Sequence, residues 1–337
     1  MRGPIHLVDR NPMVPPADLL LDFVPPPRFT NARFSTYQPD RSQPSQTKAV
    51  NDLRRFSLGI GASHVEKHRQ RRKGVRGSRR DPSGVYIDGG FGVGKTHLLA
   101  ALYQTAAGRR SYGTFSEYAN VVDALGPKAT LAALAKNSLV CIDEFELDRS
   151  DEMKSVVALA SALVRHHVKV AAASISRPND LGSRSSTAST FKREMKGLGS
   201  RFEIVRIKGE DYLRRDLWAV PQMRSNHQVA EAATQITASL DSFDTLIAHL
   251  GTIHPSEYAA LLNGLRTVCV QDVRQLLNED DAQRFVVFVD RLYDRNLAFV
   301  ASGLRFDRVF SPPMLAGPRR DRYLRAVARL NSLAVSS

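Results

Sequence analysis

The sequence predicts an α/β fold in three layers, with a parallel sheet between two layers of helices. Short apolar runs that are typical of buried strands recur at residues 84–88, 139–142 and 168–175. Stretches with the apolar spacing of helices lie between these runs. Strands that alternate with helices along a chain form parallel sheets with right-handed crossovers. We expect a smaller C-terminal region, of α/β or helical type, after this domain.

Length and composition agree with a protein of two domains. The chain has 337 residues, of which 42% are hydrophobic. No stretch approaches the roughly 18 apolar residues of a membrane span, and the first residues lack the apolar core of a signal peptide, so we expect a cytoplasmic protein. Cys141 and Cys269 lie in apolar runs without a metal or redox motif, and we expect both to be reduced core residues.

The elements of the first domain can be placed in order. The first 50 residues are proline-rich and irregular, and we expect them to lie over a domain surface without a core of their own. A helix follows Pro44, because apolar residues then recur at helical spacing. The strand at 84–88 leads to a helix at 95–107, and a helix over about 117–136 leads to the strand at 139–142.

The remaining elements follow the same patterns. In the first domain they are a helix from Glu152, a strand at 168–175, a loop at 183–190, a helix at 191–198 and a strand at 202–207. In the C-terminal region they are helices near 229–238, 243–250, 280–296 and 321–333, and strands at 268–270 and 297–301. The expected domains are an irregular segment at 1–50, a core at 51–215 with a basic loop at 64–80, and a C-terminal region at 216–337.

A nucleotide phosphate loop is the most informative motif. Residues Gly89 to Thr96 read Gly-Gly-Phe-Gly-Val-Gly-Lys-Thr, between a predicted strand and a predicted helix. Glycines let backbone N–H groups turn inward around phosphate oxygens, and the helix N-terminus adds its positive dipole end. Lys95 would reach the β- and γ-phosphates, and the Thr96 hydroxyl would hold magnesium. The alternative is a glycine-rich turn before a helix. The predicted nucleotide-binding residues are Gly89, Gly90, Phe91, Gly92, Val93, Gly94, Lys95 and Thr96.

Two carboxylates extend this prediction from binding to hydrolysis. Asp143 and Glu144 follow the apolar run at 139–142. Ligands of open α/β sheets collect at the carboxyl ends of the strands, so these side chains should lie beside the phosphate loop. We predict that Asp143 helps to hold magnesium and that Glu144 polarises the attacking water. The alternative is an acidic N-cap for the helix that begins near Glu152.

The charge of the chain is strongly basic but names no partner. The formal net charge is +14, and part of the excess lies in the loop at 64–80. A solvated insertion, an acidic partner and a phosphate-rich partner such as nucleic acid all fit this loop. Charge-driven peripheral contact with a membrane also stays open.

Further motifs carry a resemblance to a known family. They are Pro26-Pro27-Arg28-Phe29, Tyr37, Pro44-Ser45-Gln46, the phosphate loop, residues 141–147, 178–181 and 209–212, and the groups Arg284-Phe285 and Leu292-Tyr293-Asp294. With these motifs the chain resembles the ZapE-like cell-division branch of the AAA+ ATPases, the AFG-like ATPases, in an actinobacterial-type form. The resemblance covers nearly the whole chain.

This resemblance implies a magnesium-dependent ATPase that self-assembles, with ATP sites completed by an arginine from the neighbouring subunit. Arg201 looks like that catalytic arginine, since a guanidinium across an interface would neutralise charge on the γ-phosphate. Arg193 is the second choice, and a structural arginine is the alternative. The implied partner is a protein, either FtsZ or an envelope-associated protein, at the division site.

One departure concerns the sensing of the γ-phosphate. The family usually shows Thr-Ser-Asn where this chain has Ala173-Ser174-Ile175-Ser176. Ser174 or Ser176 could substitute for the asparagine, although a serine side chain is shorter.

Three interpretations of function therefore stay open. The first is an ATPase that remodels a protein partner. The second is a nucleic-acid-associated ATPase of helicase-loader type, and the third is a scaffold that binds nucleotide without hydrolysing it.

Overall fold

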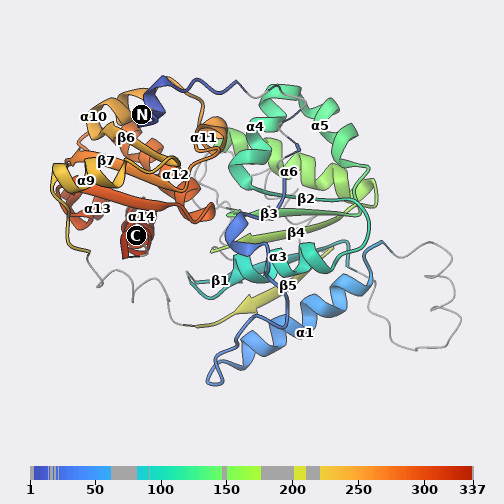
Figure 1. Ribbon diagram of the computed structural model, residues 1–337. Coiled ribbons are helices and arrows are strands. Elements are labelled where there is room, and N and C mark those ends of the chain that lie inside the picture. The colour runs from blue at the N-terminus through green and yellow to red at the C-terminus, as the bar shows by residue number, and fades with distance from the viewer. Residues whose placement is uncertain are drawn as a thin grey trace, which may run out of the picture. The chain divides into compact units, whose positions relative to one another are not determined.

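Two compact units make up the chain (Figure 1). The computed structural model describes residues 4–13, 15, 18, 20–21, 23–61, 82–90, 92–145, 150–175, 201–209 and 221–335. The P-loop unit consists of Pro15–Pro25 and Phe29–Asp211, and the C-terminal unit consists of Met1–Val14, Pro26–Arg28 and Tyr212–Ser337. The division is therefore not contiguous in sequence, unlike the expected boundaries. The expected basic loop at 64–80 and helix at 191–198 lie outside the described residues.

The P-loop unit contains a five-stranded parallel sheet in the order β2-β3-β4-β1-β5. Its strands are β1 (Gly84–Gly89), β2 (Arg110–Thr114), β3 (Leu139–Asp143), β4 (Lys169–Ser174) and β5 (Phe202–Ile207). The predicted parallel sheet is thus confirmed. The strand β2 was not predicted, because its residues Arg-Ser-Tyr-Gly-Thr form no apolar run.

Helices cover both faces of this sheet, which confirms the three-layer fold (Figure 1). On one face lie α1 (Pro44–Leu58) and α3 (Lys95–Thr105), and on the other α4 (Phe115–Leu125), α5 (Pro127–Leu134) and α6 (Ser150–Arg165). Alternation along β1 produces this division. Val85 and Ile87 pack in one apolar cluster with Leu98 of α3. Tyr86 packs in another cluster with Tyr118 of α4.

The single helix expected over 117–136 is two helices. Gly126 separates α4 from α5 with a φ of 79°, and Pro127 begins α5. Glycine adopts positive φ readily, and proline suits the first position of a helix, so the pair ends one helix and starts the next. The start of α4 is fixed by a capping box between Thr114 and Glu117.

The C-terminal unit contains a second parallel sheet in the order β6-β7-β8, so this region is of the α/β type. Its strands are β6 (Ala238–Ser242), β7 (Thr267–Val273) and β8 (Ala298–Gly303). Its helices are α9 (Asn226–Ala232), α10 (Phe243–Leu250), α11 (Tyr258–Leu261), α12 (Glu279–Asp294), α13 (Pro312–Ala316) and α14 (Arg320–Val335). Short 3-10 helices span Leu7–Asp9, Pro27–Phe29, Pro255–Glu257 and Phe306–Arg308.

The helix expected at 229–238 is shorter, and the strand that follows it was missed. The helix α9 ends at Ala232, and Ala238 already belongs to β6. The pattern of β6 was hard to recognise because Ser239 and Asp241, both polar, are buried at 0% and 4% exposure.

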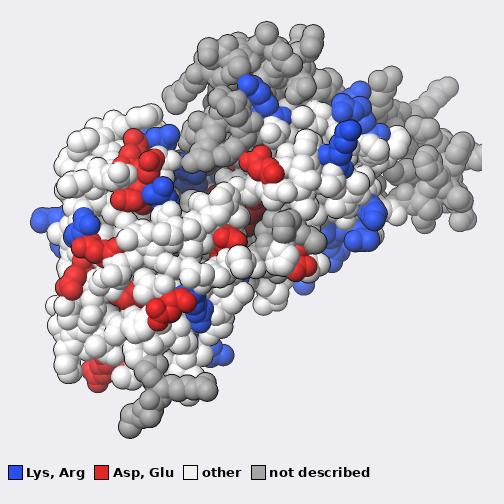
Figure 2. Space-filling view, turned by 90° about the horizontal axis from the view of Figure 1, so that it is seen from above, with Lys and Arg blue, Asp and Glu red and all other residues white. Residues whose placement is uncertain are grey.

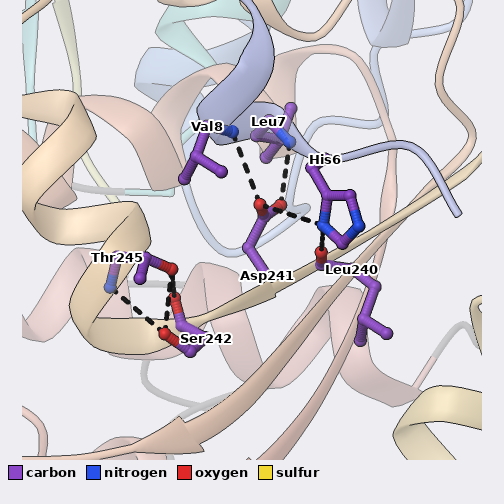
Figure 3. A network of polar contacts seen from close by, with 7 residues as sticks. All are labelled: His6, Leu7, Val8, Leu240, Asp241, Ser242 and Thr245. Atoms are coloured by element: carbon purple, nitrogen blue, oxygen red, sulfur yellow. Dashed lines mark hydrogen bonds and ion pairs between the residues drawn. The ribbon is translucent and has the colours of Figure 1, made fainter.

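The first residues of the chain explain why Asp241 is buried (Figure 3). Its carboxylate accepts hydrogen bonds from the amides of Leu7 at 3.0 Å and Val8 at 3.4 Å, at the start of a 3-10 helix. Ile5 pairs in parallel with Ser239 of β6. Leu7 is fully buried in the core of the C-terminal unit, although it was expected over a surface.

The P-loop unit also incorporates part of the N-terminal segment. Phe23 is 7% exposed and lies edge-on to Tyr118, with ring centroids 4.8 Å apart. Its carbonyl accepts a hydrogen bond from the Tyr112 amide on the edge strand β2. The segment therefore contributes side chains to both cores.

The two cysteines are buried, as the sequence predicts. Cys141 and Cys269 are buried free thiols. Burial raises the pKa of both. Among the described residues, no helix is long and apolar enough to cross a membrane.

Candidate nucleotide site

The phosphate loop lies where the sequence places it, between the carboxyl end of β1 and the start of α3. Gly92 and Gly94 have φ values of 69° and 86°, which glycine adopts readily. A Cβ atom on Gly94 would lie 2.5 Å from the Tyr37 ring. One on Gly89 would lie 2.6 Å from the Ile207 carbonyl oxygen, whereas one on Gly90 would meet no described atom within 4 Å. Glycine is thus required at Gly89 and Gly94 by close packing. Phe91 lies outside the described residues.

Lys95 directs its ammonium group into this loop. Its Nζ donates hydrogen bonds to the carbonyl oxygens of Gly89 at 2.9 Å and Gly90 at 2.5 Å. Lys95 is the first residue of α3, so the same turn holds the cation and a helix N-terminus. Both features favour an anionic ligand at this place.

Asp143 ends β3 and is 5% exposed. Its Oδ2 accepts a hydrogen bond from the Tyr112 hydroxyl at 2.6 Å, and its Oδ1 accepts one from the Glu144 amide at 2.9 Å. The Thr96 side chain lies near this carboxyl group. Burial raises the pKa of Asp143, and the nearby charge of Glu144 adds to this rise, while Tyr112, the Glu144 amide and Thr96 act in the opposite direction. The two residues predicted to hold magnesium therefore lie near each other.

Glu144 begins the turn that leaves β3, and its side chain is partly exposed. Its φ is 50°, a left-handed value that is uncommon for a residue with a side chain. The next residue, Phe145, is 3% exposed, and its amide donates a hydrogen bond to the Ala173 carbonyl at 2.8 Å. The turn is thus anchored on β4 one residue after the glutamate.

Tyr112 is a residue of the site that sequence reasoning missed. It lies on β2, next to β3 in the sheet, and is 2% exposed. The register pairs Thr114 with Asp143, so Tyr112 sits two residues earlier on the same face as the aspartate. Recognition of β2 as a strand would have been the signal, but its sequence is too polar for that.

The N-terminal segment also contacts the phosphate loop. The Tyr37 hydroxyl donates a hydrogen bond to the Val93 carbonyl at 2.8 Å, and its ring lies against His97 with centroids 5.7 Å apart. The Nε2 atom of His97 lies 3.0 Å from the Thr36 hydroxyl and 3.1 Å from the Arg33 carbonyl. Tyr37 stood out in the sequence only as a motif residue, with no role.

The start of α1 is joined to the end of β5 near the same loop. The Ser45 hydroxyl accepts a hydrogen bond from the Lys208 amide at 2.9 Å, and the Gln46 side-chain amide donates one to the Lys208 carbonyl at 3.0 Å. A Cβ atom on Gly209 would lie 2.8 Å from that Gln46 nitrogen and 3.1 Å from Val93. The motif Pro44-Ser45-Gln46 thus lies close to the phosphate loop.

Arg201 is not brought together with the other predicted site residues. It is exposed and precedes β5, where its carbonyl accepts a hydrogen bond from the Ser83 amide at 2.9 Å. The parallel register pairs Phe202 with Gly84 and Ile207 with Gly89. Arg201 therefore lies at the amino ends of these strands, whereas the phosphate loop lies at their carboxyl ends. Five residues of a strand separate the two ends, a distance of about 17 Å. Within one chain, Arg201 and the phosphate loop therefore lie at opposite ends of the strands. Arg193 and Ser176 lie outside the described residues.

The fold and the site define a P-loop protein of the AAA+ class: a five-stranded parallel sheet in the order β2-β3-β4-β1-β5 with a phosphate loop after β1 and an acidic pair after β3. The profile of one family, the AFG1-like ATPases, matches residues 14–237 and 219–336 of the chain. The chain therefore belongs to the AFG1-like ATPase family, and its resemblance to the ZapE-like branch is confirmed.

Individual relatives are more distant. The cell division protein ZapE of Escherichia coli K12 is 24% identical over 264 residues, which are 65% of this chain and 70% of that protein. The ZapE protein of Escherichia coli O157:H7 gives the same values. A DnaC helicase loader structure is 18% identical, with a TM-score of 0.40, over 54% of this chain and 99% of its own. A structure of the replication initiator DnaA bound to AMPPCP and single-stranded DNA is 12% identical, with a TM-score of 0.40, over 90% and 88%. At these scores the structural likenesses support no inference about ligands or partners.

Proposed function

We propose that this protein hydrolyses ATP with magnesium and couples hydrolysis to the remodelling of a protein partner in cell division. One observation carries the ATPase part: the Thr96 side chain lies beside the buried Asp143 carboxyl group, and the preceding residue, Lys95, directs its ammonium group into the phosphate loop. A hydroxyl, a carboxylate and an ammonium group at the ends of adjacent elements form a donor set that fits a nucleotide and a magnesium ion.

Each of these residues has a proposed task. The Lys95 ammonium binds the β- and γ-phosphates, and the loop glycines allow the backbone to approach them. The side-chain oxygens of Thr96 and Asp143 hold magnesium, and the Tyr112 hydroxyl keeps the Asp143 carboxylate in place. Bound magnesium supplies charge neutralisation at the phosphates.

Glu144 is the proposed residue that polarises the attacking water. It follows Asp143 directly, is partly exposed, and is held in a turn with an uncommon backbone conformation. Such conformations persist where the surrounding structure fixes them, and they are frequent at functional sites. A carboxylate at this place can accept a proton from water as it attacks.

Arg201 is proposed to act on the site of a neighbouring subunit. Its exposure and its place at the opposite end of the sheet from the phosphate loop support action across an interface, not within the same chain. Self-association into an assembly with shared ATP sites is therefore part of the proposal.

The partner and the place of action rest on the distant relative. The relative carries the name of a cell division protein, and we extend that role to this chain, with FtsZ or an envelope-associated protein as the partner. The proposed location is cytoplasmic with recruitment to the division site, and peripheral contact with a membrane belongs to the same hypothesis.

The direct test is ATP hydrolysis measured over a range of protein concentration. Specific activity should rise with concentration and should be lost in Lys95→Ala, Glu144→Gln and Arg201→Ala. Arg109→Ala is the matched control for the last variant, because Arg109 is also exposed and also precedes a strand, with its carbonyl bonded to a neighbouring amide. Equal loss in both arginine variants would refute the role of Arg201.

Two other functions are decided by related experiments. The basic loop favours a nucleic-acid partner, and salt-dependent DNA binding that is lost on neutralising Arg69, Arg71, Arg72 and Lys73 would support it. On the face that Figure 2 presents, basic side chains of the described residues form small groups, several of them directly beside acidic ones. A scaffold would bind ATP through Lys95 without turnover, and Glu144→Gln would then change nothing.

A further inference from the structure

Ser174 ends β4 and is 1% exposed. Its hydroxyl donates a hydrogen bond of 2.7 Å to the carbonyl oxygen of Phe145. The Phe145 amide donates to the carbonyl of Ala173, so both backbone polar groups of Phe145 are bound to two consecutive residues of β4. Phe145 directly follows Glu144, whose φ is 50°. The turn that carries the glutamate is thus fixed from β4, and Ser174 supplies the side-chain part of this attachment.

The Ser174 hydroxyl lies on the face of the sheet away from the phosphate-loop helix. Ala173 packs in the apolar cluster of α3, whereas Tyr86 and Phe145 belong to the cluster on the other face. Ser174 hydrogen-bonds to Phe145 and to the Tyr86 side chain. Asp143 instead contacts Tyr112 and Thr96, which lie on the α3 side. Ser174 therefore does not face the place where the γ-phosphate would lie.

The Phe145 ring completes the anchor. It lies edge-on to Phe115 with ring centroids 5.2 Å apart and edge-on to Tyr86 at 6.1 Å. A buried ring resists displacement of the side chain, but the ring alone does not fix the orientation of the peptides on either side of it. The amide hydrogen bond to Ala173 holds the peptide that joins Glu144 to Phe145, and the Ser174 bond to the Phe145 carbonyl oxygen holds the peptide that follows, so the backbone is restrained on both sides of Phe145.

We infer that Ser174 is a positioning residue for Glu144: its bond to the Phe145 carbonyl holds the turn so that the carboxylate faces the attacking water. This inference rests on the proposed function, in which Glu144 polarises that water. It assigns Ser174 a task in place of γ-phosphate sensing. A serine suits the task because its hydroxyl can donate to the Phe145 carbonyl oxygen and interact with the Tyr86 hydroxyl at the same time.

The test compares Ser174→Ala, Ser174→Thr and the control Ser111→Ala. Ser111 is a buried serine of the same sheet, and its hydroxyl accepts a hydrogen bond from the Asn137 side chain, away from the turn. A small displacement of a catalytic group costs up to about 100-fold in rate, so we expect Ser174→Ala to lower kcat about ten-fold. The KM for ATP should stay within about two-fold, because the phosphate loop is untouched. Threonine should retain most of the activity.

A double variant shows whether Ser174 acts through Glu144. In the Glu144→Gln background, Ser174→Ala should cause no further loss of the residual rate measured at high enzyme concentration, because the group that it positions is already gone. An unchanged kcat in Ser174→Ala, a further loss in the double variant, or an equal loss in Ser111→Ala would each overturn the inference. A raised KM with unchanged kcat would also overturn it, since it would indicate contact with the nucleotide.

The outcomes also separate this inference from the proposed function. Should the wild type lack ATPase activity, or should Glu144→Gln retain it, the proposed function fails and the inference fails with it. Should the wild type be active and Glu144→Gln inactive while Ser174→Ala behaves as the wild type, only the inference fails. If Ser174→Ala does not fold, as judged by its melting temperature, Ser174→Cys gives the same decision, because the thiol is a weak donor of similar size.

Discussion

Replacement of Tyr112 by phenylalanine should weaken magnesium binding, because it removes the hydrogen bond to Asp143, while the packing of the ring stays intact. The hydroxyl donates to Asp143 Oδ2 at 2.6 Å, and both residues are buried, at 2% and 5% exposure. A hydrogen bond to a charged group contributes about 1.5–3 kcal/mol to stability, and phenylalanine keeps the ring but removes the donor. We therefore expect the free energy of unfolding to fall by about 1.5–3 kcal/mol, since the buried Asp143 oxygen loses one donor.

Urea denaturation followed by circular dichroism measures this loss, and the magnesium concentration that gives half-maximal ATPase activity should rise in the same variant. Tyr103→Phe is the control. Tyr103 is 8% exposed and lies edge-on to Tyr112, and its hydroxyl has no hydrogen bond to the part of the chain that the structure describes. An equal loss of stability in both variants, or none in Tyr112→Phe, would refute the reasoning.

Three further outcomes are expected. Gly94→Ala should abolish binding of a fluorescent ATP analogue, because its φ of 86° is strained for alanine and the new Cβ would lie 2.5 Å from Tyr37; Gly126→Ala, with a φ of 79° but outside the phosphate loop, is the comparison. Tyr37→Phe should weaken the same binding about five-fold, the equivalent of about 1 kcal/mol for one lost hydrogen bond to Val93, and unchanged affinity would contradict this role. Burial raises the pKa of Asp241 above its ordinary 3.8, so the folded chain binds a proton that the unfolded chain releases, and stability should fall as pH rises from that value through the raised pKa. Melting temperatures measured against pH should lose this slope in Asp241→Asn, and a retained slope would assign it to other groups.

The parts of the site that are local in sequence could be predicted, and the parts that depend on pairing could not. The phosphate loop and the pair Asp143 and Glu144 are continuous motifs, each next to an apolar strand. The contact of Tyr112 with Asp143 needs the pairing of β2 with β3, which comes from residues of low strand character. The contact of Tyr37 with the loop joins positions 56 residues apart and follows no periodic pattern.

The fold shows the same difference. The strands of the main sheet with apolar runs were recognised because buried parallel strands look alike in any protein. The short strand β6 was missed because burial of the polar Asp241 depends on Leu7, whose amide binds it from more than two hundred residues away in sequence. The role of Ser174 also depends on tertiary structure, since only the structure shows which face of β4 its hydroxyl occupies.

The packing of residues 5–8 on β6 has a consequence for folding during synthesis. Leu7 and Asp241 are 234 positions apart, so Leu7 is synthesised long before the residue that binds its amide. Every strand and helix of the P-loop unit is synthesised before Asp241 exists, and domains generally fold as units during synthesis. The P-loop unit can therefore mature on the ribosome, whereas the C-terminal unit closes late and through contacts of long sequence separation, which form slowly. A chain that stalls or breaks before β6 would leave the side chain of Leu7, which the complete fold buries, exposed to solvent.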